Sequence, residues 1–458
     1  MRLSSVRLET SPRRLLQHPV GIVADVAAAF RALVGEADGF WLDSAAPEAS
    51  SARPGVHYLG RGERLVIAGR VLDTLRAELA DHPIEAGDDL PAFRLGLVGW
   101  LEYELRAETL GQAVDAESPP AALLRVDRML AVDAATGEGR LIALGDDWSG
   151  ELALWRDAAV AALTGLGPGE PAEAQPAETQ TAEARWLDDD ATYLEHIRAC
   201  QEAIREGEAY QLCLTTRVEV PGVHPDPVDL LTALRRTSPT HHGGLIRIGD
   251  TTLVSASPER FLRVDAHGRV DTSPIKGTRP RGADAASDAA ARVELLESDK
   301  ERAENLMIVD LMRNDLSRVC EVGSVAVTHL LEVESYAQVH QLVSTVEGRL
   351  RDGVDVADLV EACFPAGSMT GAPKRRATEL LHELEARPRG IYSGAFGWFG
   401  FDGACDLAMV IRSIVLDPSG ASIGTGGGIT ALSDPAAELD EIRVKAAPLL
   451  RVLGASAR

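Results

Sequence analysis

The stretch GAFGWFGFDGACDLAMVIRSIVLDPSG, residues 394–420, contains two apolar runs, each followed by a turn signal. The pair Asp402-Gly403 lies between the runs 394–401 and 405–416, and an Asp-Gly pair between apolar runs is typical of a β-hairpin. The sequence Asp-Pro-Ser-Gly at 417–420 then turns the chain into a third strand. This part of the chain therefore predicts consecutive antiparallel strands.

Strands and helices alternate upstream of this hairpin. Hydrophobic periodicity and capping residues predict helices over residues 193–206, 227–236 and 283–319, and strands over residues 210–220, 252–264, 269–273 and 336–350. We expect a mixed α/β (α+β) fold in which antiparallel sheet dominates the C-terminal half and helices lie outside it.

Composition divides the chain into three parts. Residues 167–185 are rich in Pro, Ala and Glu and have little to bury, which is typical of a linker or a long surface loop. We therefore expect an N-terminal region over residues 1–166 and a catalytic region over residues 186–452.

The overall charge and the cysteines narrow the function classes. The 458 residues carry a formal net charge of −24, which disfavours binding to nucleic acid or to an anionic membrane. The five cysteines form no C-x-x-C pair, as expected for reduced, buried thiols in a reducing compartment. Because the sequence contains neither a signal-peptide core nor eighteen consecutive apolar residues, we expect a cytoplasmic protein.

The last predicted helix, residues 433–447, brings charged residues together. Glu438, Glu441 and Lys445 fall on one arc beside an apolar stripe, so we expect them to be partly buried. A surface ion pair between Glu441 and Lys445 is the plain alternative.

A second predicted helix carries matching carboxylates. Glu301 and Glu304 lie on one face, ahead of an apolar turn. Carboxylates from two helices, with no His or Cys beside them, favour a hard cation such as Mg²⁺ over Zn²⁺. Such an ion would also attract an anionic substrate to an acidic protein.

Two further segments could approach an anion. The glycine-rich segment 424–429 follows a predicted strand, and its exposed N–H groups, in a loop, could contact a carboxylate or phosphate. Ser368 begins a segment that opens a helix, where free N–H groups favour an anion, although an ordinary helix start is equally compatible.

Lys276 and Glu259 are the candidate catalytic side chains. The chain has only four lysines, and an amine, unlike a guanidinium, can lose its proton and act as a nucleophile. Burial and nearby cations would lower the pKa of Lys276, whereas an apolar setting would raise that of Glu259 and suit a general acid. Chance retention of the lysine and simple pairing of Glu259 with an arginine are the alternatives.

Several of these segments together resemble a known family. SPERF, PIKGTRPRG, RAENLMIVDLMRNDLSRV, FPAGSMTGAPKRRA, GIYSGAFGWFG, IRSIV, GTGGGI and SDPAAELDEIRVK occur in the order found in chorismate-utilising enzymes, the anthranilate synthase and aminodeoxychorismate synthase component I family. The close resemblance covers about residues 186–450, and residues 41–44, 57–60 and 96–105 resemble the family more loosely. It implies two large, mainly antiparallel sheets in a sandwich with helices outside, holding Mg²⁺ and chorismate.

The resemblance also implies roles for individual residues. Glu304 and Glu441 match the magnesium ligands, with Glu301 and Glu438 close by. The residues matching the substrate-binding positions are Gly277, Thr278, Ser368, Tyr392, Arg412, Gly426, Gly427, Gly428 and Lys445.

Two positions distinguish members of the family. Anthranilate synthases carry alanine where this chain has Lys276, and a histidine where it has Gln341. Aminodeoxychorismate synthases carry the lysine, which is implied to attack carbon 2 of chorismate while Glu259 protonates the departing hydroxyl. The resemblance therefore implies magnesium-dependent amination at carbon 4, toward p-aminobenzoate and folate.

The remaining implications concern partners and alternatives. The sequence contains no G-x-C-x-G nucleophile turn, so a separate glutamine amidotransferase subunit is the implied ammonia donor. The segment 238–243 departs from the family's tryptophan-feedback motif, which speaks against tryptophan inhibition. An anthranilate or isochorismate-type synthase and a non-catalytic chorismate-binding subunit stay open as alternatives.

Overall fold

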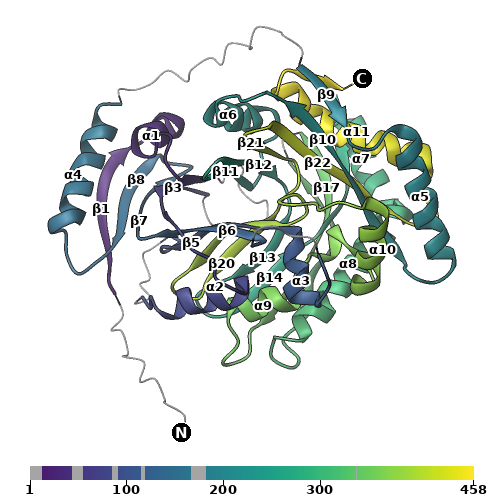
Figure 1. Ribbon diagram of the computed structural model, residues 1–458, viewed down its shortest axis with the longest axis horizontal. Coiled ribbons are helices and arrows are strands. Elements are labelled where there is room, and N and C mark those ends of the chain that lie inside the picture. Colours follow the sequence, from purple (N-terminus) through teal and green to yellow (C-terminus); the bar gives the residue numbers. More distant parts are fainter. Residues whose placement is uncertain are drawn as a thin grey trace.

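The computed structural model describes residues 13–43, 55–84, 91–114, 119–166, 182–336 and 338–457. Within them the strands form two large sheets, and helices pack on the outer faces (Figure 1). The mixed, mainly antiparallel fold predicted from the sequence is confirmed. Most of the predicted linker, residues 167–181, lies outside the described residues, and residues 182–185 belong to a strand.

The larger sheet has 13 strands in the described part of the chain. In spatial order they are β1 (Leu15–Ile22), β8 (Glu138–Leu144), β7 (Arg128–Asp133), β3 (Val56–Arg61), β2 (Gly39–Asp43), β11 (His242–Ile248), β12 (Thr251–Ser257), β21 (Ser413–Asp417), β22 (Gly420–Ile429), β10 (Gln211–Pro221), β9 (Ala182–Trp186) and β23 (Ala455–Ala457), with β18 (Gly371–Ala372) beside β10.

The smaller sheet has 10 strands within the same described ranges. They are β15 (Ile275–Pro280), β17 (Val339–Arg349), β14 (Arg269–Ser273), β13 (Arg260–Val264), β20 (Cys405–Met409), β19 (Ala395–Gly400), β5 (Gly96–Leu101), β6 (Ala121–Val126) and β4 (Glu63–Arg64), with β16 (Ala326–Ser335) beside β17.

Both sheets combine strands from the two ends of the chain. Strand β2 pairs with β11 in the larger sheet, and β5 pairs with β19 in the smaller one. The apolar side chains between the sheets likewise come from both regions, with Phe40 and Trp100 packed in one cluster with Phe396. The N-terminal strands therefore complete the sandwich that holds the candidate site.

Eleven α-helices lie within the described residues. They are α1 (Val26–Leu33), α2 (Val71–Ala80), α3 (Arg106–Leu110), α4 (Gly150–Thr164), α5 (Asp190–Arg205), α6 (Pro227–Thr237), α7 (Ala285–Glu297), α8 (Asp299–Ser317), α9 (Val356–Cys363), α10 (Lys374–Glu385) and α11 (Pro435–Val452). Figure 1 shows α1, α6 and α11 on one side of the sandwich and α2 and α9 on the other.

Helix α11 begins as predicted but ends later. Asp434 caps it by accepting a hydrogen bond from the N–H of Ala437, with Pro435 at its first position. The helix continues through Pro448 to Val452. The carbonyl that Pro448 leaves without a donor is that of Val444, an exposed residue, so water can satisfy it.

The predicted strand over residues 405–416 is in fact two strands in different sheets. Strand β20 lies in the smaller sheet and β21 in the larger one, and the chain crosses between them at residues 410–412. Arg412 has a φ of 51°, a left-handed conformation that turns the backbone at this crossing. Both sheets bury apolar strands, so the apolar run alone gave no sign of the break.

The structure also bears on the predictions about the thiols and about membrane-spanning helices. All five cysteines are buried and free, as expected. Among the described residues, no helix combines the length and the apolar character needed to span a membrane.

Candidate active site

Carboxylates from α8 and α11 meet at strand β22. A methyl group placed on Gly427 would lie 3.0 Å from Glu438 Oε2, and one on Gly428 would lie 3.4 Å from Glu304 Oε2. The two glycines therefore let both helices bring carboxylates against the strand. Glu438 is only 2% exposed and Glu304 only 6%. The side chains of Glu441 and Lys445 are 42% and 32% exposed, so the charged arc of α11 is partly buried, as predicted.

Three of the four lysines reach these carboxylates. Lys276 Nζ lies 3.7 Å from Glu304 Oε2, Lys300 Nζ lies 3.0 Å from Glu438 Oε1, and Lys445 Nζ lies 2.6 Å from Glu441 Oε1. Lys445 also donates to the carbonyl of Gly426 at 2.8 Å. The predicted i, i+4 pair on α11 therefore exists, but as part of a larger cluster beside the glycine strand.

The donor set in this cluster suits a hard cation. Glu304 Oε1 and Glu438 Oε2 are buried and have no hydrogen-bond partner, which is costly for carboxylate oxygens unless a cation or a donor reaches them. Among the described residues, no three or more His, Cys, Asp or Glu side chains are arranged so that they could hold a metal ion together. Lysine amines neutralise the carboxylates instead, while the orphaned oxygens keep the set compatible with Mg²⁺.

Glu301 lies at the edge of the cluster. Arg279 Nη1 contacts its carboxylate at 3.4 Å, and a methyl group on Gly277 would lie 3.0 Å from its side-chain carbons. Gly277 has a φ of 79° at a register shift in β15, so it supplies a conformation that other residues adopt only with strain.

The pKa of Lys276 is raised, whereas the sequence analysis predicted that it would be lowered. Burial does lower it, but the carboxylates of Glu304, Glu259 and Glu441 and the thiol of Cys213 outweigh that effect. The prediction was wrong because it considered only the cations near Lys276 in sequence. The opposing carboxylates come from elements distant in sequence.

Glu259 matches the prediction of a raised pKa. The side chain is 7% exposed, and burial raises its pKa to about 7, although the Ser368 hydroxyl, Lys276 and Lys445 each lower it in part. Glu259 lies between β12 and β13, where the chain passes from the larger sheet to the smaller one. It can therefore hold a proton near neutral pH and release it to an acceptor in the site.

Both crossings between the sheets carry a candidate site residue. The carbonyl of Glu259 accepts a hydrogen bond from Met409 N at 3.0 Å, and that of Arg412 accepts one from Ala256 N at 3.1 Å. These bonds link the two crossings side by side. Burial lowers the pKa of the Arg412 guanidinium, and Tyr392 and Glu441 oppose that effect.

The glycine-rich segment belongs to β22 rather than to a loop. Gly426, Gly427 and Gly428 pair with Thr215, Leu214 and Cys213 of β10. On the other side of β22, pairing with β21 stops at Ser422, and β21 itself begins at Ser413, where the chain enters the larger sheet. The segment therefore presents an unpaired backbone edge toward the crossing. Its N–H groups can still approach an anion, but from the edge of a strand and not from a loop.

The remaining predicted residues lie around the same space. Ser368 is buried in a short 3₁₀ turn, and its hydroxyl lies near enough to Glu259 to lower the pKa of that carboxyl in part. The ring of Tyr392 packs on Gly424, where any side chain would overlap it. Thr278, Gln341 and Arg412 line a cavity of about 140 Å³ together with Pro258, the neighbour of Glu259.

Sequence reasoning missed two residues of this cluster. Lys300 contacts Glu438, but the sequence marks it only as one of the four lysines of the chain. Gln211 is 1% exposed, and a side chain on Gly428 would overlap its amide. The scarcity of lysine could have signalled Lys300, whereas nothing in the sequence around Gln211 marks it.

The comparisons with known proteins identify a family and its relatives. The family described as chorismate binding enzyme matches residues 38–451. Aminodeoxychorismate synthases of Streptomyces pristinaespiralis and Streptomyces griseus are 41% and 43% identical over 96% and 94% of this chain. The chain spans only 65% and 63% of these two relatives.

Other relatives carry a different name. Anthranilate synthase component 1 of Thermus thermophilus is 38% identical, over 83% of this chain and 82% of its own length. The crystal structure of anthranilate synthase component I from Streptococcus pneumoniae has a TM-score of 0.73 and 28% identity, covering 98% of this chain and 95% of that one. The menaquinone-specific isochorismate synthase of Escherichia coli has the same TM-score at 18% identity and supports the fold alone.

Proposed function

This chain belongs to the chorismate binding enzymes, and we propose that within this family it aminates chorismate at carbon 4 to give 4-amino-4-deoxychorismate. The relatives named aminodeoxychorismate synthase support this choice, and the anthranilate synthases make the main alternative. The product would serve p-aminobenzoate and folate synthesis. Its amino group would come from a separate glutamine amidotransferase subunit that supplies ammonia.

One observation carries the proposal. The amine of Lys276 and the protonatable carboxyl of Glu259 lie close enough to interact, beside the glycine strand and the crossing that holds Arg412. A buried nucleophile and a buried acid in one space are what substitution of a hydroxyl on an anionic ring requires.

The reaction can be written with these two side chains. Because its pKa is raised, Lys276 must first give up a proton, for which Glu259 is the neighbouring acceptor. The neutral amine then attacks carbon 2, the ring double bonds shift, and the bond from carbon 4 to oxygen breaks as Glu259 gives its proton, so that water leaves. Ammonia then attacks carbon 4, the double bonds shift back, and the bond from carbon 2 to the lysine nitrogen breaks. Lysine returns as a free amine, and the new ammonium group stays on carbon 4.

Binding groups surround these two residues. Arg412 and Lys445 would hold the substrate carboxylates, together with the backbone N–H groups of residues 426–428. Tyr392 and Ser368 would limit the position of the substrate. We propose Mg²⁺ as the cofactor, held by Glu304 and Glu441 with Glu301 and Glu438 nearby. When bound, the ion would neutralise and orient a substrate carboxylate.

Gln341 favours amination over anthranilate formation. The neighbouring histidine, His340, is bound through Nδ1 to Ser335 Oγ at 2.8 Å and through Nε2 to Asp288 Oδ1 at 3.0 Å. Because adjacent strand residues point to opposite faces, His340 cannot serve as a base in the space that Gln341 lines. An enzyme that retains the enolpyruvyl group needs no base there.

The test is identification of the product by mass spectrometry. The purified chain is incubated with chorismate, Mg²⁺ and ammonium, with and without a lyase that releases p-aminobenzoate. We expect a chorismate-like amine that the lyase converts to p-aminobenzoate, and no such product from Lys276→Ala. Arg375→Ala, an exposed position on α10, is the matched control. Fluorescent anthranilate from the parent chain would instead establish the alternative.

A further inference from the structure

A second cavity, of about 200 Å³, lies between the sheets beside the candidate active site. Ser422 and Gly424 line it, whereas the glycines that meet the carboxylates lie further along the same strand, β22. The ring of Tyr392 packs on Gly424, between the cavity and those glycines. The cavity includes no residue of the segment 238–243, so it is distinct from the place that the family resemblance associates with tryptophan.

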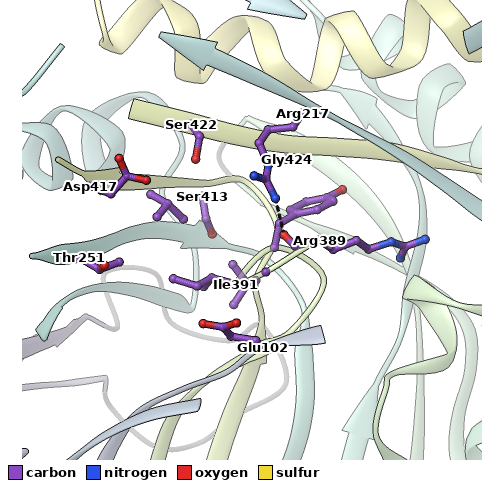
Figure 2. A pocket seen from close by; sticks show the side chains of 13 residues that line it. Glu102, Arg217, Thr251, Arg389, Ile391, Ser413, Asp417, Ser422 and Gly424 are labelled. Carbon is purple, nitrogen blue, oxygen red and sulfur yellow. Dashed lines mark hydrogen bonds between the residues drawn. The ribbon is translucent and has the colours of Figure 1, made fainter. Parts of the chain in front are cut away.

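Two side chains of opposite charge face each other across this cavity. Arg217 extends from β10 and Glu102 follows β5, and Figure 2 shows them on opposite sides of the cavity, with Ile391 and Ser413 between them. Arg217 donates through Nη2 to the carbonyls of Pro388 at 3.1 Å and Arg389 at 2.9 Å. Within the described part of the chain, neither Arg217 nor Glu102 forms a salt bridge.

The pKa shifts of both groups have the direction expected for charges whose burial is only partly compensated. Burial lowers the pKa of Arg217 and outweighs the opposing effect of Glu219, Glu104 and Asp417. Burial together with the neighbouring Glu104 raises the pKa of Glu102 to about 7. The Trp100 indole and Arg217 offset only part of the rise at Glu102. A partly buried charge without a partner is costly, so both sites gain from a ligand of opposite charge.

The other charged groups on the wall are already engaged. Arg389 binds both carboxylate oxygens of Glu385 and the carbonyls of Met369 and Cys213. Asp417 accepts hydrogen bonds from the backbone N–H and the hydroxyl of Ser419. Arg217 and Glu102 are therefore the pair available to a ligand.

We propose that this cavity binds a small α-amino acid, with its carboxylate on Arg217 and its ammonium group on Glu102. A simple anion would leave Glu102 without compensation, and a simple cation would do the same for Arg217. Ile391, Val410 and Val415 provide an apolar wall for a short side chain. The cavity volume falls below the range of about 300–1,000 Å³ typical of larger ligands, which favours an amino acid with a short side chain.

Binding to this cavity can be measured without turnover of chorismate, so its outcome is independent of the proposed function. Isothermal titration calorimetry at neutral pH would compare L-alanine, L-valine and L-glutamine with two one-charge analogues of valine, isovalerate and isobutylamine. We expect an amino acid to bind and both analogues to bind at least about tenfold more weakly, since each loses one charged contact.

Variants assign that binding to the cavity. Arg217→Gln and Glu102→Gln should each weaken amino-acid binding at least about tenfold, whereas the exposed controls Arg375→Gln and Glu151→Gln should not. Isovalerate binding as tightly as valine would overturn the proposal in favour of a simple anion site. Absence of binding by every amino acid tested would overturn the proposal too. If a variant fails to fold, the comparison of valine with its two analogues on the parent chain tests the proposal by itself.

Discussion

Gln341 lies opposite Thr278 in the pairing of β17 with β15, while His340 lies opposite Arg279. This register places Gln341 beside the candidate site and His340 on the other face, where Ser335 and Asp288 hold its ring. A difference of one position in sequence thus determines whether an imidazole is available for chemistry.

His340→Ala should therefore reduce stability and leave amination close to that of the parent chain. The buried ring loses two hydrogen bonds, so we expect the free energy of unfolding to fall by about 1–3 kcal/mol. Urea unfolding and the rate of product formation would be measured together. A large loss of rate in a fully folded variant would contradict the structural role.

Glu259 should make both activity and stability depend on pH. If the protonated carboxyl is the acid, the rate should fall about tenfold per pH unit above its pKa of about 7. The folded-state pKa lies above the unfolded value of about 4.3, so the folded chain binds the proton more tightly. Stability is therefore greatest below that unfolded value and declines by about 3 kcal/mol as the pH rises through 7.

Glu259→Gln separates these two effects. The neutral amide should lower the rate by at least about 100-fold, because it cannot donate a proton as an acid. The same change should remove the decline in stability between pH 5 and pH 8, which urea unfolding at a series of pH values would show. An unchanged decline in the variant would assign the pH dependence to another group.

The cation ligands can be tested by substitution within two helices. Glu304→Gln and Glu441→Gln should each raise the Mg²⁺ concentration needed for half-maximal binding more than about tenfold, since each removes a negatively charged oxygen. Asp310→Asn is the matched control, because Asp310 lies on α8 with its side chain 83% exposed. Calorimetric Mg²⁺ titration measures the effect without turnover. Equal affinities in all three variants would place the ion elsewhere.

The sequence predicted those elements whose signals are local. The cap at Asp434, the apolar stripe of α11 and the faces of Glu304 and Glu438 all follow from helical spacing. The hairpin of β19 and β20 follows from its turn residues. In each case the deciding residues lie within one or two turns of one another.

The remaining features depend on partners far apart in the chain. The raised pKa of Lys276 comes first of all from Glu304 on α8 and also from Glu441 on α11. Likewise, the pairing of β21 with β22 ends at Ser422, near the point where the chain crosses from β20 to β21 at Arg412. Local periodicity contains no information on such distant charges or on which sheet an apolar strand joins.

A buried ion pair connects three parts of the candidate site. Arg389 Nε and Nη2 bind Glu385 at 2.8 and 2.7 Å, and the same guanidinium donates to the carbonyl of Met369, next to Ser368, and to that of Cys213, opposite Gly428. Glu385 in turn accepts bonds from the N–H and hydroxyl of Thr215, both at 2.9 Å. The pair therefore fixes the Ser368 turn against strand β10.

Arg389→Met should lower the free energy of unfolding by about 3–5 kcal/mol, because it leaves the carboxylate of Glu385 buried without its cation. The double variant Arg389→Met, Glu385→Gln should be more stable than Arg389→Met alone, because glutamine still accepts from Thr215 but carries no charge. Urea unfolding of the parent, both single variants and the double variant gives the coupling energy. Additive losses would mean that Arg389 acts mainly through the carbonyls of Met369 and Cys213, and the pair would then contribute little through its charge.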